Sequence, residues 1–154
     1  SRTLAKMLDA VDVTDSELVL DIGSGYGYSA AIIAHLAEAV VALESEDKHA
    51  NEMQNALIDH GIDNVIVERG SLFDGAASHS PYDVIFIQGG IELVPDEILT
   101  QLKEGGRIVA IFMQGSLGSV KIGYKLYNEV SWRFAFNAGA PVLDGFKKEM
   151  TFTF

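Results

Sequence analysis

The sequence predicts an α/β protein whose central, mostly parallel sheet has helices on both faces and ends in an antiparallel hairpin. Three observations support this class. Apolar strand segments alternate with helical segments five times, the connections between them are short, and the last segments show the period-two alternation of antiparallel strands. Right-handed crossovers between parallel strands place the helices on the two faces of the sheet. A seven-stranded, doubly wound sheet is expected.

The first half of the chain contributes three strands and three helices to this prediction. A helix is expected over residues 2–11, because Leu4, Met7, Leu8 and Val11 recur at helical spacing. The strand "ELVLDIG" follows, then a helix from Tyr28 to Glu38, the strand "AVVALES", and a helix from Glu46 to His60 that Gly61 ends. The segment "NVIVERG" reads as a further strand.

The second half continues the alternation and then changes it. "YDVIFIQGG" is a predicted strand, Pro95 begins a short helix through Leu102, and Gly105 and Gly106 turn into the strand "RIVAIFM". "VKIGYKLYN" and "VSWRFAFNA", separated by little more than Glu129, are expected to form an antiparallel hairpin at the sheet edge. Trp132, Phe134 and Phe136 should lie on one face of the last strand and pack there.

Length and composition limit the classes of function. The 154 residues fit one domain, and no segment approaches the roughly 20 apolar residues of a membrane span, so a cytoplasmic protein without a membrane partner is expected. A net charge of -11, with 11 thinly spread Lys and Arg, argues against nucleic-acid binding.

No metal is expected, because there is no cysteine and the histidines lack ligand spacing: His35, His49, His60 and His79. Ser29 lies outside any G-x-S-x-G pattern, so it is not expected to be a nucleophile.

The stretch "DIGSGYGY", residues 21–28, follows the first predicted strand and marks the candidate binding site. Ligands of open parallel sheets bind at the carboxyl ends of the strands, and glycines let a ligand approach the main chain without meeting a Cβ. The spacing is G-x-G-x-G, whereas dinucleotide enzymes favour G-x-G-x-x-G and would need glycine where Tyr28 stands. A glycine turn without a ligand remains the alternative.

Glu44 is a second candidate binding residue, in addition to the glycine turn. It ends the second predicted strand, 23 residues after Asp21, and a carboxylate there can accept hydrogen bonds from both hydroxyls of a ribose. The alternative is a solvated acid beside Glu46 and Asp47 at the start of the next helix.

With these residues in order, the chain resembles the cofactor-binding, C-terminal part of the protein-L-isoaspartate O-methyltransferase family, whose members are class I S-adenosylmethionine-dependent methyltransferases with a Rossmann-like fold. The resemblance covers most of the chain. It rests on "LVLDIGSGYGYSAAIIAHLA", "VVALE", "NVIVERGSLFDG", "PYDVIFIQGG" and "VPDEILTQLKEGGRIVAIF".

The resemblance implies S-adenosylmethionine as cofactor and a set of residues that bind it. Asp21 and the backbone from Gly23 to Gly27 would hold the methionine portion, Glu44 the ribose, and Ser71 and Leu72 the adenine. Gln88, at the end of the fourth predicted strand, would face the transferred methyl group, although Gln88, Gly89 and Gly90 could equally be an uninvolved turn. The full set of cofactor-binding candidates is Asp21, Gly23, Ser24, Gly25, Tyr26, Gly27, Tyr28, Glu44, Ser45, Gly70, Ser71, Leu72 and Gln88.

Two features depart from the family pattern. An acidic residue usually follows the glycine that matches Gly70, but here Ser71 stands there, so either Ser71 accepts from the adenine amino group more weakly or Asp74 reaches in. The family's N-terminal segment, which covers the active site and contacts the substrate carboxylate, is also not found ahead of the first predicted helix. We therefore expect a single cofactor-binding domain of residues 1–154 that lacks this substrate-covering segment.

The implied reaction is methylation of the carboxylate of L-isoaspartyl residues in damaged proteins or peptides. A carboxylate with a pKa near 4 is already ionised at neutral pH and needs no general base, so the sequence singles out no catalytic side chain. The alternatives are a methyltransferase for another small molecule or protein group, and a nonenzymatic cofactor-binding or scaffold protein. The oligomeric state does not follow from the sequence.

Overall fold

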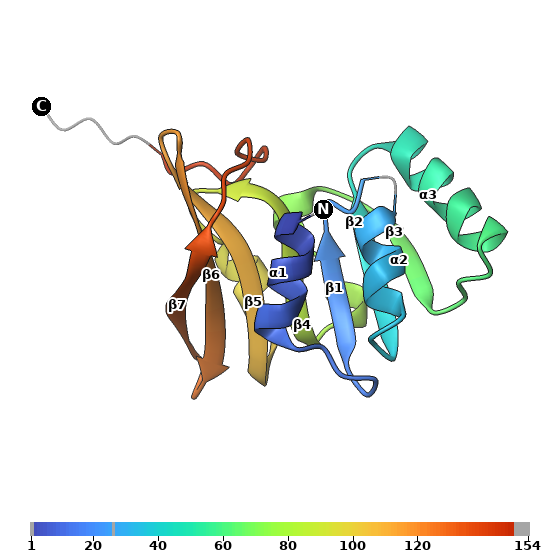
Figure 1. The fold of residues 1–154 in the computed structure, drawn as a ribbon, viewed down its shortest axis with the longest axis horizontal. Helices are drawn as coiled ribbons and strands as arrows, with labels where there is room; N and C mark the ends of the chain where they lie inside the picture. The colour runs from blue at the N-terminus through green and yellow to red at the C-terminus, as the bar shows by residue number, and fades with distance from the viewer. Residues whose placement is uncertain (1, 26, 150–154) are drawn as a thin grey trace, which may run out of the picture.

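The computed structural model describes residues 2–25 and 27–149, which build one sheet in the strand order β3-β2-β1-β4-β5-β6-β7 (Figure 1). The first five strands are mutually parallel, and β6 is antiparallel to both β5 and β7. The seven-stranded α/β sheet with a C-terminal antiparallel hairpin is therefore confirmed. The strands are β1 (Leu18–Ile22), β2 (Ala39–Glu44), β3 (Val65–Arg69), β4 (Tyr82–Ile91), β5 (Leu102–Gln114), β6 (Leu117–Leu126) and β7 (Glu129–Asn137).

Helices cover both faces of this sheet. One face packs against α1 (Arg2–Val11), α2 (Tyr28–Ala34) and α3 (Asp47–Asp59), which bury residues such as Met7, Ile33 and Met53 in one apolar core. The other face packs against α4 (Asp96–Thr100) and the segment around Phe146. Two short 3₁₀ helices, Leu72–Asp74 and Ala77–His79, lie between β3 and β4 along the chain. Because buried residues alternate between the two cores along each central strand, both faces of the sheet are apolar.

Helix ends follow local chemistry, and the predicted bounds hold only where that chemistry is visible in the sequence. Gly61 adopts φ +67° and ends α3, as expected for a glycine just past a helix. Helix α2 ends at Ala34, earlier than the predicted Glu38. The Asn64 side chain donates to the carbonyl oxygens of Ala34, Ala37 and Glu38, at 2.8–3.4 Å, and holds the chain in a turn there. Helix α4 also ends short, at Thr100, because β5 begins at Leu102.

The predicted turn at Gly105 and Gly106 is wrong, because both glycines lie within β5. The register shifts between the Tyr82–Leu102 and Val84–Arg107 pairs, so the extra residues of β5 form a bulge. Gly105 has φ +84°, a conformation that favours glycine.

The hairpin turn also lies at other residues than the prediction gives. Glu129 begins β7, and the turn is made by Tyr127 and Asn128, with φ +53° and +62°. Two consecutive residues with positive φ in a two-residue loop form a type I′ turn, whose twist matches that of the flanking strands.

The three aromatic residues of β7 do not share a face, contrary to the prediction. Lys121 pairs with Phe134 while its neighbour Val120 pairs with Phe136, so a bulge turns Phe136 to the opposite side of the sheet from Phe134. Trp132 packs edge-to-face on Phe112 with ring centroids 4.7 Å apart, whereas the Phe134 side chain is 61% exposed.

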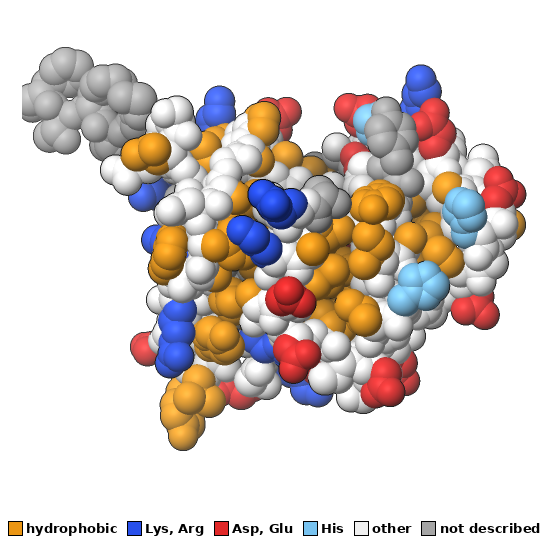
Figure 2. Space-filling model, in the orientation of Figure 1, with side chains coloured by type: hydrophobic (Ala, Val, Ile, Leu, Met, Phe, Trp, Pro, Cys, Tyr) orange, Lys and Arg blue, Asp and Glu red, His pale blue; other side chains and the backbone are white. Residues whose placement is uncertain are grey.

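Charge is distributed unevenly over the molecule. In Figure 2, acidic and histidine side chains gather over α3, and most of the visible Lys and Arg side chains lie toward β5–β7. Within the described part of the chain, no helix has the length and apolar character needed to span a bilayer.

Candidate functional site

A cavity of about 440 Å³ opens at the carboxyl ends of β1 and β2. The chain order reverses beside it, since β1 lies between β2 and β4, and open parallel sheets bind ligands at such a point. The lining residues come from the glycine turn, the end of β2, the start of α3, the first 3₁₀ helix and the C-terminal segment. They are Gly23, Gly25, Glu44, Ser45, Glu46, His49, Ser71, Leu72, Phe73, Leu143 and Asp144.

The glycine turn presents bare main chain to this cavity. Gly23 and Gly25 have φ values of +79° and +65°, which residues other than glycine rarely adopt. A Cβ added at Gly25 would have no atom within 4 Å, because it would project into open space. The turn thus leaves room for a ligand against the backbone.

Glu44 lines the cavity at the end of β2 and contacts the glycine turn directly. Its side chain is only 6% exposed, and its two oxygens accept from the amides of Gly25, at 2.9 Å, and Ser45, at 3.0 Å. A carboxylate oxygen has more than one lone pair, so both oxygens can still accept from hydroxyl groups of a ligand. Glu44 therefore ties the glycine turn to the end of β2 and faces the cavity.

Asp21 lies behind the turn, fully buried at the end of β1. The Ser29 hydroxyl donates to Oδ2 at 2.6 Å, and Gln88 Nε2 donates to Oδ1 at 2.9 Å. Burial raises the pKa of Asp21, and the hydrogen bonds from Ser29, Gln88 and Ser24 oppose that shift because they favour the charged form. This network fixes the start of α2 and the end of β4 relative to β1.

The far end of the cavity is closed by two segments that are distant in sequence. Leu72 and Phe73 come from the first 3₁₀ helix, and Leu143 and Asp144 from the C-terminal segment. Gly145 has φ +87°, and a Cβ there would lie 2.7 Å from Phe73 Cγ, so the backbone rests directly on the Phe73 ring. This contact holds the exposed Asp144 at the edge of the cavity.

The structure places the predicted site residues in three groups. Those that line the cavity are Gly23, Gly25, Glu44, Ser45, Ser71 and Leu72. Asp21, Ser24 and Gln88 lie behind it in the buried network. Gly27, Tyr28 and Gly70 do not line it: a Cβ on Gly27 would meet Met53 Cγ at 2.6 Å, Tyr28 is 65% exposed at the start of α2, and Gly70 donates to the Glu44 carbonyl oxygen at 3.2 Å. Tyr26 lies outside the described residues.

Sequence reasoning missed several residues of the site. His49, with Nδ1 at 3.4 Å from Glu46 Oε2, lines the cavity, as do Phe73, Leu143 and Asp144. Asp74, one of the two expected acceptors near Ser71, is not among the lining residues, and Asp144 brings a carboxylate there instead. The one sequence signal for His49 is its position shortly after Glu44 and Glu46, at the start of the same predicted helix. Nothing in the sequence near Asp144 indicates that it returns to this cavity.

The arrangement suits an organic ligand of moderate size that carries hydroxyl groups. The cavity falls within the range of about 300–1,000 Å³ found for small-molecule and cofactor sites. Buried Glu44 provides acceptors at one wall, and Leu72, Phe73 and Leu143 provide apolar surface at another. Residues 2–25 and 27–149 contain no cluster of three or more His, Asp or Glu side chains that could hold a metal ion.

Comparison with known proteins identifies relatives of this chain. The family model described as Protein-L-isoaspartate(D-aspartate) O-methyltransferase matches residues 1–123. The Protein-L-isoaspartate O-methyltransferase 2 of Polaromonas sp. is 38% identical over 106 residues, which are 69% of this chain and 50% of that protein. The enzyme of the same name from Anaeromyxobacter sp. is 38% identical over 120 residues, covering 77% of this chain and 48% of its own length. The chain therefore spans about half the length of the curated relatives it matches.

Solved structures show the same fold. A protein-L-isoaspartate O-methyltransferase superposes with a TM-score of 0.86 at 28% identity, over 93% of this chain and 47% of that one. A structure from Plasmodium falciparum, described as a putative enzyme of this kind in complex with S-adenosyl-L-homocysteine, has a TM-score of 0.75 at 16% identity, over 92% of this chain and 71% of its own.

Proposed function

The chain belongs to the protein-L-isoaspartate O-methyltransferase family, and from that premise we propose that it is an S-adenosylmethionine-dependent methyltransferase that esterifies L-isoaspartyl residues of damaged proteins or peptides. The observation that carries the proposal is the 440 Å³ cavity, in which positive-φ glycines and the buried Glu44 meet at the carboxyl ends of β1 and β2. It has the size, bare main chain and hydroxyl acceptor that this cofactor requires.

The proposed placement follows the chemistry of each wall. The main chain at Gly23 and Gly25 lies against the methionine portion, and the Glu44 carboxylate accepts from the ribose hydroxyls. Ser71 and Leu72 border the adenine, and Asp144 accepts from its amino group in place of the acid that the family usually has after the glycine matching Gly70.

Methyl transfer asks the protein mainly to hold two reactants in line. When bound, S-adenosylmethionine supplies an electrophilic methyl group on a sulfonium. Asp21 acts through position, because its bonds to Ser29 and Gln88 fix the glycine turn against the end of β4. An acceptor carboxylate is ionised at neutral pH, so no side chain of the site has to remove a proton.

Two measurements test this proposal. Calorimetry with S-adenosylhomocysteine should show one saturable site on the chain. A methyl-transfer assay should label an isoaspartyl peptide and leave the matching aspartyl peptide unlabelled. Binding without transfer to isoaspartate would favour another acceptor, and the absence of cofactor binding would favour a nonenzymatic scaffold. The cytoplasmic location, the absence of nucleic-acid partners and the single cofactor-binding domain remain predictions from the sequence.

A further inference from the structure

A second and larger cavity, of about 1,220 Å³, lies beyond the carboxyl end of β5 and is not used by the proposed cofactor placement. The β5–β6 hairpin forms one wall, and the chain before and after the cofactor-lining residues Leu143 and Asp144 forms others. Its volume exceeds the range of about 300–1,000 Å³ for small-molecule sites, which favours an extended ligand such as a polypeptide.

This second cavity lies in the positive part of a negative protein. Residues 102–154 carry seven Lys and Arg and four Asp and Glu, a net charge of +3, whereas residues 1–101 carry four and 18, a net charge of -14. Three of the seven cations line the second cavity: Lys121, Lys147 and Lys148. With Glu92 and Glu149 also in the lining, three cations face two acids, so this cavity carries a small positive charge in a protein that is negative overall, which favours an anionic ligand.

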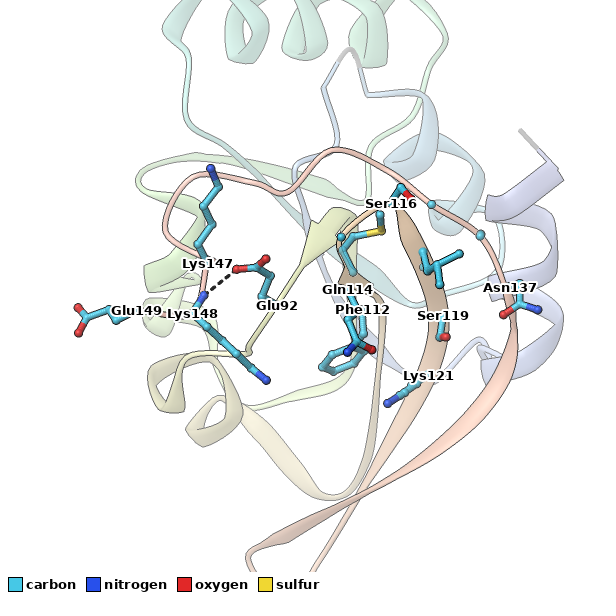
Figure 3. A pocket seen from close by; sticks show the side chains of 16 residues that line it. Glu92, Phe112, Gln114, Ser116, Ser119, Lys121, Asn137, Lys147, Lys148 and Glu149 are labelled. Atoms are coloured by element: carbon cyan, nitrogen blue, oxygen red, sulfur yellow. Dashed lines mark hydrogen bonds between the residues drawn. The ribbon is translucent and has the colours of Figure 1, made fainter. Parts of the chain in front are cut away.

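The side chains of Lys121 and Lys148 extend into the space around Phe112 (Figure 3). Lys121 Nζ lies 5.2 Å from the centre of the Phe112 ring, which Trp132 supports from another side. Of the two acids that line the cavity, Glu92 accepts from the Lys148 backbone amide at 2.9 Å, and Glu149 points away from Phe112. The lysine ammonium groups and an aromatic surface are therefore offered together.

One lining residue of each cavity packs against a neighbouring glycine at the end of β4. A Cβ on Gly89 would lie 2.6 Å from Cγ of Leu143, which lines the cofactor cavity, and a Cβ on Gly90 would lie 2.9 Å from Cγ of Met113, which lines the second. Gln88, the residue before this glycine pair, reaches back to Asp21. A chain seated in the second cavity thus lies next to the strand end that borders the cofactor site.

We infer that the second cavity binds the acceptor polypeptide beside its methylated residue, and that Lys121 and Lys148 select acceptors with acidic neighbouring side chains. The inference rests on the proposed function and adds a sequence preference to it. Acceptors with glutamate next to isoaspartate bind more tightly than the same peptides with glutamine, because the ammonium groups attract the carboxylates.

Binding of two fluorescent isoaspartyl peptides, one with flanking Glu and one with flanking Gln, tests this inference by anisotropy in the presence of S-adenosylhomocysteine. We expect the wild-type chain to prefer the Glu peptide by about tenfold at low salt and to lose most of the preference near 1 M salt, where the screening length is about 3 Å. The double variant Lys121→Met and Lys148→Met should lose most of this preference. Lys121→Glu with Lys148→Glu should instead prefer a Lys-flanked peptide.

Lys103→Met serves as the matched control, because it removes one charge from the opposite end of β5 and should keep the preference. Equal affinity of the wild-type chain for the Glu and Gln peptides, or the absence of binding to both, would overturn the inference. Calorimetry with S-adenosylhomocysteine on the same samples reports separately on the proposed function, since neither lysine lines the cofactor cavity.

Discussion

Gly25 offers a test in which ligand binding and fold stability separate. The Gly25→Ala variant adds one methyl group at a residue with φ +65°, where that methyl would meet no atom within 4 Å. Alanine in this left-handed conformation costs about 1–2 kcal/mol, so the free energy of unfolding should fall by about that amount. The methyl group would stand in the space proposed for the cofactor.

The effect on binding follows from that position. Forcing an extra methyl group into a packed interface costs about 1–3 kcal/mol, which corresponds to a rise of about 5- to 150-fold in the Kd for S-adenosylhomocysteine. Calorimetry measures the Kd, and urea unfolding measures the stability of the same sample.

Gly61 provides a matched control for this variant. Gly61 has φ +67°, and a Cβ there also meets no atom within 4 Å, but it lies past the end of α3 and does not line the cavity. Gly61→Ala should therefore lose the same stability and keep the wild-type Kd. If Gly25→Ala bound S-adenosylhomocysteine as tightly as Gly61→Ala, the ligand would not approach the glycine turn, and the reasoning would be refuted.

Three further predictions concern other parts of the molecule. Hydrogen bonds from Arg107 lower the pKa of Glu17 from its usual 4.5. Ionised Glu17 therefore stabilises the fold above pH 4.5, and this contribution is lost as the pH falls through the lowered pKa of the folded state. The stability difference between wild type and Glu17→Gln should thus shrink in urea titrations as the pH is lowered from about 7 to 3. Tyr127→Asn should raise the melting temperature, since the exposed tyrosine occupies a left-handed turn position that costs about 1 kcal/mol and that asparagine tolerates; a fall would contradict the turn assignment. Asp144→Asn should weaken S-adenosylhomocysteine binding, measured by calorimetry, by about tenfold, and adding Ser71→Asp to this variant should restore the binding. An unchanged Kd in Asp144→Asn would show that Asp144 does not contact the ligand.

The parts of the fold that are encoded locally could be predicted from the sequence. The helical spacing of Met7 and Val11 predicts α1, and Gly61 marks the end of α3. The sequence also predicts that the glycine turn and Glu44 lie together, because parallel strands bring their carboxyl ends to one edge, and Gly23, Gly25 and Glu44 line the same cavity. These inferences needed only periodicity and topology.

The parts that depend on contacts between distant residues could not be predicted. Asn64 ends α2 through its side chain, and the shift of register at Phe136 depends on its pairing with β6. Gln88 reaches Asp21 across 67 residues, and Asp144 reaches the cavity only because the C-terminal segment returns over β4. Single-sequence patterns do not report such long-range contacts.

The most direct test of the cofactor site is calorimetry of S-adenosylhomocysteine with the wild-type chain and with Glu44→Gln. The wild-type chain should bind with one-to-one stoichiometry. Glu44→Gln should raise the Kd by about 10- to 150-fold, because hydrogen bonds to a charged group contribute about 1.5–3 kcal/mol. Glu46→Gln, a change of the same kind at the cavity edge, should leave the Kd within about threefold of wild type. A folded wild-type chain that does not bind, or an unchanged Kd in Glu44→Gln, would contradict the account.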